Sequence, residues 1–448
     1  MWTSPSLTKF SIAAIGTIAC SSLFACSPLV LDDLDATSST ASTSTASTGT
    51  ATSSSQTSDP LDLAAQKEEL AKLTPNLGVL RPYLRGNDKF GWQPGQLGRP
   101  EEFWNRRVNN RPVHPDSSEV TNYLAYVSRK DKSDPKTEFF GQFDLGKKAK
   151  GENYSFHILE SDSNTPRYDF RRKLRGNGFP EDEFYSPHCD RIAMPVPTDG
   201  RLQGEPDYRC SGGGDCHLYV VASHEGRIYE QYRSDNPGPN KRTYSGGCTN
   251  VWDLQTTQPE NLRGLSCTSS NAAGIPYIPL LITPGEIKAG VIRHALAFTL
   301  PNAWVERDTY ARPATHNPIV SARWGAPQEA PGKAMRYGSH LRLDQDFRIS
   351  PDWPPSLKVV LQALKDYGMY HIDGGPRFIV ASNDAYSAHH WDDPDIALNP
   401  FDLTQIAGLS WTNFDVISKA GATGSMTRNS CRRRPMREKP PKPGTAAL

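Results

Sequence analysis

The sequence predicts a mainly β, loop-rich protein with a few short helices. Short segments rich in Val, Ile, Tyr and Phe recur along the body of the chain, and several alternate apolar with polar side chains as half-buried strands do. The 37 Pro and 35 Gly interrupt the chain too often for long helices. A chain of 448 residues with this pattern fits one large β domain with appendages.

The N-terminus has the features of a bacterial export signal. Lys9 precedes an apolar run from Phe10 to Phe24, which is too short to span a bilayer. Leu23-Phe24-Ala25-Cys26 resembles a lipobox, so residues 1–26 are predicted to be a signal peptide with Cys26 as the lipidated residue. Ordinary signal cleavage near Ala25 is the alternative. The protein is therefore expected outside the cytoplasm, as an outer-membrane or cell-surface lipoprotein or as a secreted protein, with a lipid on Cys26 as its one membrane contact.

Composition divides the rest of the chain into four parts. Residues 27–60 are rich in Ser and Thr and predict a flexible linker. Residues 61–112 predict a short helix followed by an irregular segment rich in Arg, Pro and Trp. Residues 113–420 carry the strand patterns and predict a β domain. Residues 421–448 are basic and rich in Pro, so a disordered tail is expected there.

Within the β domain, alternation and helix-end signals predict the following elements. The best helix runs from Ser356 to Tyr367, with Gly368 after it, and Thr283 caps a second, short helix. A hairpin is expected around Asp373-Gly374-Gly375. Strands are predicted at residues 123–127, 139–143, 154–159, 191–197, 293–300 and 338–343.

The cysteines support export. Once Cys20 is removed and Cys26 is lipidated, an even number remains, namely Cys189, Cys210, Cys216, Cys248, Cys267 and Cys431. Even numbers in exported chains indicate disulfides. Short loops favour Cys210 with Cys216 and Cys248 with Cys267. No Cys-x-x-Cys pair is present, so a zinc ribbon is not expected.

The segment from Asp215 to Tyr232 predicts a β-hairpin whose two-residue turn is Glu225-Gly226. Val221 then lies opposite Glu230, and side-chain alternation gives the hairpin one apolar face. The other face gathers acids, an imidazole and phenols, which are residue types suited to binding and cleaving a sugar chain. These residues are Asp215, His217, Tyr219, Glu230 and Tyr232. An ordinary polar sheet face is the competing interpretation.

Asp215 and Glu230 are the candidate carboxylates for glycoside hydrolysis, which needs two carboxyl groups roughly 5 to 10 Å apart. On straight strands the expected register separates them by about 20 Å, so the pair requires a bend or bulge. Otherwise each acid needs a partner from another segment, which weakens the case for a hydrolase. His217 is assigned to tuning or positioning these acids. Tyr219, Tyr232 and Trp252 are expected to bind sugar rings.

A polysaccharide lyase is the first alternative, with His217 or a tyrosine removing the proton beside a uronate carboxylate. A non-catalytic carbohydrate-binding or structural envelope lipoprotein is the second. His294 on a predicted strand, and Arg312 and His316 in a predicted loop, complete the expected binding residues. A core histidine is the competing interpretation of His294.

Several function classes are not expected. The net charge of +1 and the absence of a basic patch interleaved with aromatics give no reason to expect nucleic acid as a partner. The sequence has no Gly-x-Ser-x-Gly, P-loop or dinucleotide fingerprint, so no cofactor is predicted. Residues 389–395 include metal-ligand types but no standard spacing, so no metal site is predicted.

From residue 113 to about 417 the order of segments resembles a family of exported bacterial β-sandwich proteins, most of them without an assigned function. The resemblance rests on Asp215-x-His217-x-x-Val220-Val221, Tyr229-Glu230-x-Tyr232, Val251-Trp252-Asp253-Leu254, His294-Ala295-Leu296-x-Phe298-Thr299 and Leu361-x-Ala363-Leu364-x-x-Tyr367-Gly368-Met369. It implies a jelly-roll or concanavalin-like sandwich, a shape that often handles polysaccharides. The extra cysteines, an Arg-rich insert near Arg171 and the basic tail depart from the family pattern.

Overall fold

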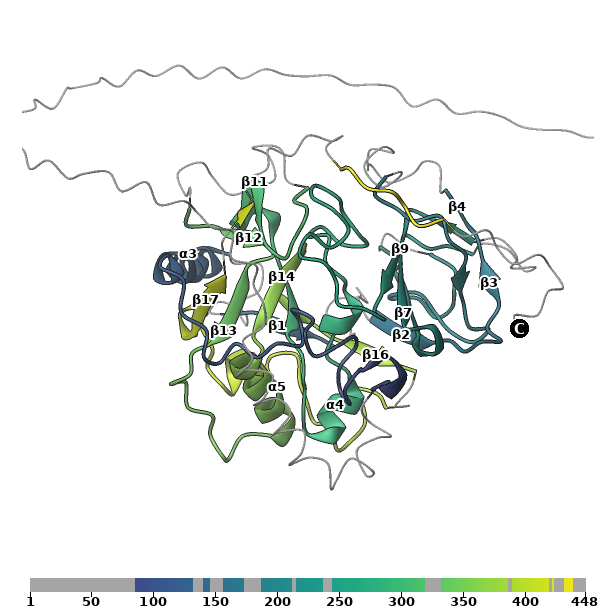
Figure 1. Cartoon of the computed structure of the whole chain (residues 1–448). Helices are drawn as coiled ribbons and strands as arrows, with labels where there is room; N and C mark the ends of the chain where they lie inside the picture. Colours follow the sequence, from purple (N-terminus) through teal and green to yellow (C-terminus); the bar gives the residue numbers. More distant parts are fainter. Residues whose placement is uncertain are drawn as a thin grey trace, which may run out of the picture. The chain divides into compact units, whose positions relative to one another are not determined.

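A computed structural model describes ten segments of the chain, which are residues 85–131, 140–145, 156–172, 187–211, 215–236, 244–318, 332–385, 389–418, 421–422 and 431–437. Within them the chain forms mixed β-sheets and short helices (Figure 1). The mainly β prediction is therefore confirmed. The predicted signal peptide with Cys26, the linker and the first short helix lie outside the described residues.

The larger of the two main sheets has six strands and combines parallel with antiparallel pairs. The parallel pairs are β1 with β15 and β10 with β14. The expected hairpin around Asp373 is wrong, because β14 and β15 lie on opposite sides of β10 rather than beside each other. The strand order is β1 (Gln142–Asp144), β15 (Phe378–Val380), β10 (Leu296–Leu300), β14 (Met369–Gly374), β13 (His340–Leu343) and β17 (Phe414–Ser418).

The second main sheet has five strands and carries the predicted hairpin. Its order is β16 (Ser382–Asp384), β2 (Phe156–Glu160), β6 (Leu218–Ala222), β7 (Arg227–Tyr232) and β9 (Cys248–Asp253). The pairs β16–β2 and β2–β6 are parallel, whereas a jelly roll is built from antiparallel strands. Three small sheets complete the described structure. One has the order β12 (Met335–Tyr337), β11 (Val305–Ala311) and β18 (Gly421–Ala422). The other two are pairs, β3 (Arg167–Tyr168) with β5 (Met194–Pro195) and β4 (Phe170–Arg172) with β8 (Tyr244–Gly246).

Two helix predictions are confirmed. Helix α5 (Pro355–Asp366) buries the expected apolar stripe beside β13. Helix α4 (Pro284–Ala289) begins with a capping box, in which Glu286 reaches back to the cap residue Thr283. The other described helices are α3 (Ser117–Lys130) and α6 (Asp402–Gln405), with 3-10 turns at Asp88–Phe90, Ser223–Glu225, Ile278–Leu280, Asn302–Trp304 and Trp411–Asn413.

Helix α3 replaces the strand that was predicted at residues 123–127. Val120, Leu124 and Ser128 are buried at helical spacing, while Tyr126 between them is exposed. Glu119 lies in the first turn and Arg129 and Lys130 lie in the last, where each charge complements the helix dipole. The five-residue window that begins at Tyr123 is too short to show this helical spacing, which explains the wrong prediction.

The irregular segment before α3 is part of the core. Trp92 and Trp104 are fully buried, and the indole of Trp92 donates to the Leu254 carbonyl at 3.0 Å, while that of Trp104 donates to the Leu97 carbonyl at 2.8 Å. Both rings belong to the hydrophobic cluster that contains α3, α5 and both main sheets. Residues 85–112 therefore pack into the β domain rather than standing apart from it.

Three disulfides cross-link the described chain. Cys210 bonds to Cys216, as predicted. The predicted pair of Cys248 and Cys267 is wrong, because Cys248 bonds to Cys189 and Cys267 bonds to Cys431. These partners lie 59 and 164 residues apart, so no local pattern could identify them. Disulfides persist in oxidising surroundings, which agrees with a protein outside the cytoplasm.

The expected disordered tail is partly ordered. Residues 431–437 form a segment that we call the C-terminal strap, drawn in yellow beside β4 in Figure 1. Besides the Cys431 disulfide, the strap donates through Arg433 to the buried Asp190 carboxylate at 2.6 Å, and Arg191 and Arg437 form a parallel β-bridge. Asp190 also holds Arg263 at 2.7 Å, so this buried acid joins the strap to the domain.

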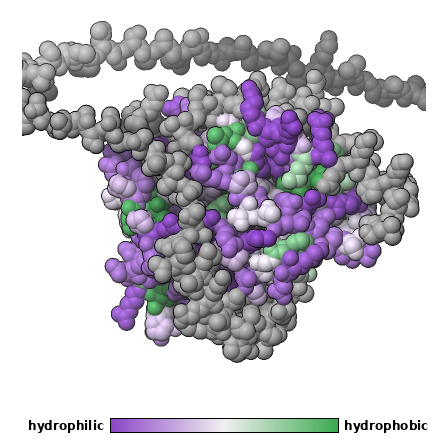
Figure 2. Space-filling view, viewed as in Figure 1, coloured by the Kyte–Doolittle hydropathy of each residue, from purple (hydrophilic) through white to green (hydrophobic). Residues whose placement is uncertain are grey.

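The visible face of the described chain is mostly hydrophilic, with small separate hydrophobic patches (Figure 2). The large hydrophobic residues that are exposed among those described are Val113, Tyr126, Leu265 and Ile406. Within the described residues no helix combines the length and apolarity needed to cross a bilayer.

Candidate functional site

The predicted hairpin is present, but its turn and register differ from the prediction. Residues Ser223–Glu225 form a 3-10 turn and Gly226 adopts φ 66°, so the connection is longer than two residues. Tyr219, rather than Val221, lies opposite Glu230. The change in register keeps side-chain parity, so His217, Tyr219, Glu230 and Tyr232 still share one face.

This face is buried rather than exposed. Tyr219 is 1%, Glu230 0% and Trp252 1% exposed, because the segment from residue 267 to 278 covers them. We call this segment the 267–278 loop. Tyr219 stacks on Phe156 with the ring centroids 5.5 Å apart, and its hydroxyl lies beside Ser270 without a hydrogen bond to it. Tyr219 and Trp252 are thus core side chains, and neither offers a ring to a sugar.

Glu230 fastens the 267–278 loop to the sheet. Its carboxylate accepts from the backbone N–H groups of Tyr277 and Ile278 at 2.5 and 2.9 Å. It also accepts from the Ser270 hydroxyl at 2.7 Å and the Trp252 indole at 3.2 Å. Burial raises the pKa of Glu230, and these four donors oppose that shift. A carboxylate enclosed in this way supports structure and lacks access to a substrate.

His217 supports the same loop. Its Nε2 lies 3.0 Å from the Ser270 carbonyl, which can only accept, so Nε2 carries a proton. Its Nδ1 contacts the Gln203 amide at 2.7 Å. Burial lowers the pKa of His217, with Asp215 acting in the opposite direction. Both ring nitrogens are thus engaged by protein groups.

Asp215 lies just before β6 and is exposed. The Tyr232 hydroxyl donates to Asp215 Oδ1 at 3.2 Å, and Arg233 Nε donates to the Tyr232 oxygen at 3.0 Å. Cys216 and Arg233, which follow Asp215 and Tyr232, have φ values of 47° and 55°. Left-handed backbone at two side-chain-bearing residues is sterically costly and is typical of functional sites.

Asp373 is a second carboxyl group beside Asp215, and the sequence did not predict its role. Phe298 of β10 pairs with His371 and the next residue, Thr299, pairs with Asp373, so Ile372 forms a β-bulge. Bulges redirect side chains at the ends of strands and near active sites. Asp373 Oδ1 accepts from the N–H groups of Gly374 at 2.8 Å and Ala272 at 3.4 Å.

Asp373 and Asp215 differ in their surroundings. Burial raises the pKa of Asp373 to about 8, with the nearby Asp215 charge adding to the effect and the two N–H donors opposing it. The phenols of Tyr232 and Tyr277 lie close enough to both carboxyl groups for each acid to raise the phenol pKa further after burial. We call Asp215, Asp373, Tyr232 and Tyr277 the carboxyl cluster.

The remaining predicted binding residues fall into two places. His316 belongs to the segment after β11 and packs against the 267–278 loop, where its Nδ1 contacts the Ala272 carbonyl at 2.8 Å. Ala272 is also the residue whose N–H reaches Asp373, so His316 belongs beside the carboxyl cluster. Arg312 instead pairs with Glu260 and Asn261 in an exposed contact. That contact gives Arg312 a structural partner and no link to the cluster.

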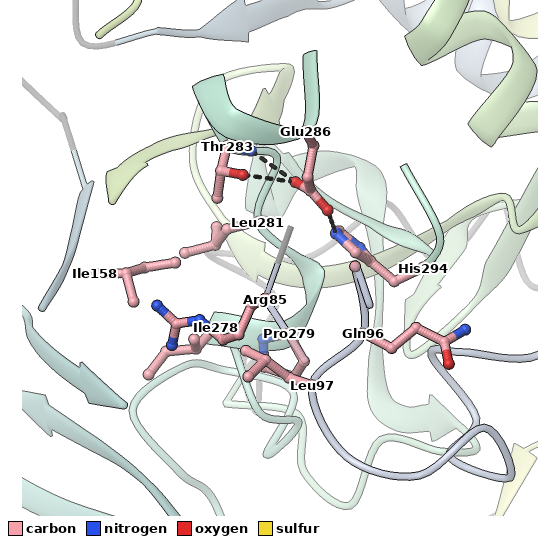
Figure 3. A pocket seen from close by; sticks show the side chains of 11 residues that line it. Arg85, Gln96, Leu97, Ile158, Ile278, Pro279, Leu281, Thr283, Glu286 and His294 are labelled. Atoms are coloured by element: carbon pink, nitrogen blue, oxygen red, sulfur yellow. Dashed lines mark hydrogen bonds and ion pairs between the residues drawn. The ribbon is translucent and has the colours of Figure 1, made fainter. Parts of the chain in front are cut away.

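His294 lies apart from the cluster, in a small cavity of about 30 Å³ that is lined in part by Arg85 and Gln96 (Figure 3). Its Nε2 contacts Glu286 Oε1 at 2.7 Å and its Nδ1 contacts the Ala295 carbonyl at 2.8 Å. Burial would lower the pKa of His294, but Glu286 outweighs burial and raises it. The pair fixes α4 against β10, which matches the core interpretation of His294.

Among the described residues, one group of metal-ligand types comes together, consisting of Glu205, Cys210 and Cys216. Its two sulfurs are joined in a disulfide and cannot act as thiolate ligands. The carboxyl cluster is therefore the best candidate for chemistry.

Neither known family models, nor curated proteins, nor solved structures match this chain.

Asp373 was missed because its Asp-Gly-Gly context is typical of a turn. Two features of the sequence pointed toward it: it follows an apolar strand segment directly, and strand ends often carry functional side chains.

Proposed function

We propose that the protein is an exported glycoside hydrolase whose catalytic carboxyl groups are Asp215 and Asp373. The observation that carries this proposal is the difference between two neighbouring acids. Asp373 has a pKa raised to about 8 and holds its proton at neutral pH, whereas Asp215 is exposed to solvent. Neighbouring carboxyl groups in unlike environments are how glycosidases divide the acid and base roles.

Each member of the carboxyl cluster has a role in this scheme. Asp373 donates its proton to the glycosidic oxygen as the bond to the leaving sugar breaks. Asp215 acts on the anomeric side, either as the base for a water molecule or as the nucleophile. The Tyr232 hydroxyl donates to Asp215 and orients it. Glu230, first considered as the second acid, instead holds the 267–278 loop in place.

The alternatives have less support. A lyase would need a base with a free lone pair, and both nitrogens of His217 contact protein groups.

Export and lipidation of Cys26 remain part of the proposal and are supported by the sequence and, for export, by the three disulfides. We also propose that the two main sheets form a sandwich, which is supported by a hydrophobic cluster that includes Trp252 from one sheet and Phe298 from the other.

The test compares the parent protein with Asp215→Asn and Asp373→Asn on a panel of neutral, cationic and uronate polysaccharides. New reducing ends are measured, and absorbance of unsaturated products reports a lyase. Each variant is expected to lose activity by a factor on the order of 10² to 10⁴, the usual contribution of a general acid or base. Asp373→Asn retains the shape of the side chain, so a lost proton is the main change.

Glu102→Gln is the matched control. Glu102 is also buried with a pKa raised to about 8, but its neighbours are Gln258, Arg106, Glu101 and Arg99 rather than the cluster. Full activity in Glu102→Gln would show that the loss of activity in the two Asn variants comes from the carboxyl cluster and not from the neutralisation of any buried acid. If both Asn variants cleave as well as the parent, the assignment is wrong. If the parent retains glycans without cleaving them, the protein is a binding lipoprotein instead.

A further inference from the structure

Ala272 of the 267–278 loop is held from both of its backbone ends. Its N–H donates to Asp373 Oδ1 at 3.4 Å, and its carbonyl lies 2.8 Å from Nδ1 of His316. The backbone N–H groups of Thr315 and His316 also donate to the neighbouring Ala273 carbonyl, at 2.9 and 3.2 Å. The Thr315 hydroxyl donates to the Cys267 carbonyl at 2.7 Å, so four hydrogen bonds join the segment that carries His316 to the loop.

The ring of His316 has a defined protonation state. A carbonyl oxygen can only accept, so Nδ1 carries the proton and donates to Ala272. Burial lowers the pKa of His316, so the ring is neutral near pH 7. The nearest ring partner is His188, whose centroid lies 6.2 Å away and whose Nδ1 accepts from the N–H of Thr268.

We propose that His316 is a positioning residue for the carboxyl cluster, because its hold on the Ala272 carbonyl keeps the Ala272 N–H directed at Asp373. The inference rests on the proposed function for its catalytic meaning, but the geometric link between His316 and Asp373 exists without it. The weak 3.4 Å contact of the N–H with Asp373 is the one that depends most on such a hold.

The groups that face Asp373 explain why this contact has an effect. The Asp215 charge raises the pKa of the Asp373 carboxyl, and two backbone donors, Gly374 and Ala272, act against it. The other titratable groups around Asp373 are Tyr219, Tyr232, Tyr277, Tyr337 and His371, and burial shifts each pKa toward the uncharged form. If the Ala272 N–H turns away from Asp373, the ionised carboxylate therefore loses one of its two backbone hydrogen-bond donors.

The test measures the titration of Asp373 itself in protein labelled with ¹³C at the aspartate carboxyl carbons. The Asp373 signal is identified as the one lost in Asp373→Asn. In His316→Leu, which has no donor, its midpoint is expected to rise by on the order of half a pH unit, because an N–H donor that stabilised the ionised carboxylate is gone. In His316→Asn, whose amide nitrogen can occupy the place of Nδ1, the midpoint is expected to stay near that of the parent.

An unchanged midpoint in His316→Leu overturns the inference, and so does an equal rise in His316→Asn. Near-ultraviolet circular dichroism confirms that both variants keep native packing. If the parent cleaves a glycan, the alkaline limb of its kcat/KM profile should move with the midpoint in His316→Leu. If the midpoint moves as expected and no glycan is cleaved, His316 positions Asp373 and the hydrolase proposal fails separately.

Discussion

Two acidic residues near the 267–278 loop have opposite roles because of their surroundings. Glu230 is fully buried and accepts hydrogen bonds from four protein donors. Asp373 is partly exposed at a β-bulge and has two backbone donors on one oxygen. All the hydrogen bonds of the Glu230 carboxylate hold the fold together, whereas Asp373 remains partly exposed.

Replacing Glu230 by Ala should destabilise the protein by on the order of 3 kcal/mol or more, because buried donors on Tyr277, Ile278 and Trp252 lose their acceptor. Urea unfolding with the disulfides intact measures the change. Glu260→Ala is the control, since its exposed pair with Arg312 should contribute little. Equal stability of the two variants would contradict the structural role of Glu230.

At the scale of elements, local sequence patterns succeeded where a helix carried both apolar spacing and end signals. Helix α5 and the capping box of α4 follow from apolar spacing and end signals within a few turns. Helix α3 was missed because a window of five residues covers little more than one helical turn, which is too short to distinguish the helical period of about 3.6 from the strand period of 2. The shared face of the hairpin was predicted because parity survives a change in turn length, whereas the register did not.

The carboxyl cluster could not be predicted from local sequence patterns. Asp215 lies just before β6 of the five-stranded sheet and Asp373 lies in β14 of the six-stranded sheet, so tertiary packing, which no local pattern encodes, brings Asp373 within range of the Asp215 charge. The same applies to the cover over the hairpin face. The sequence could indicate that acids and phenols share a face, but not that the 267–278 loop encloses Glu230, Tyr219 and Trp252.

Removal of the disulfide between the 267–278 loop and the C-terminal strap should destabilise the protein more than removal of the short-range Cys210–Cys216 disulfide. Replacing both Cys267 and Cys431 by Ser opens a loop of 164 residues, whereas replacing both Cys210 and Cys216 opens one of 6 residues. Loop entropy alone makes the first change about 3 kcal/mol more costly than the second. Urea unfolding of the two double variants tests this order, and a reversed order would contradict it.

For the whole molecule, buried titratable groups set the pH range of stability. Six histidines have pKa values lowered mainly by burial, so their neutral forms are favoured by folding and stability falls as pH drops below their unfolded pKa near 6.5. They are His157, His188, His217, His316, His340 and His371. Glu102 and Asp373 have pKa values raised to about 8, so the stability they contribute is lost as pH rises from about 4 to 8.

We therefore expect maximal stability near pH 6.5 to 7, with a decline on both sides. Denaturant titrations from pH 5 to 9 measure this curve. Glu102→Gln should flatten the decline on the alkaline side, because the variant side chain cannot ionise. A curve for Glu102→Gln that is parallel to that of the parent across this range would show that Glu102 is ionised in the folded protein.

The bond between Cys267 and Cys431 also sets an order of events during biosynthesis. A ribosome must translate past codon 431 before the segment that encloses Glu230 can be tied down. Both thiols must then reach a compartment where oxidation occurs. A chain that is still being translated, or whose two thiols are still reduced, therefore lacks the covalent link that holds this segment in place.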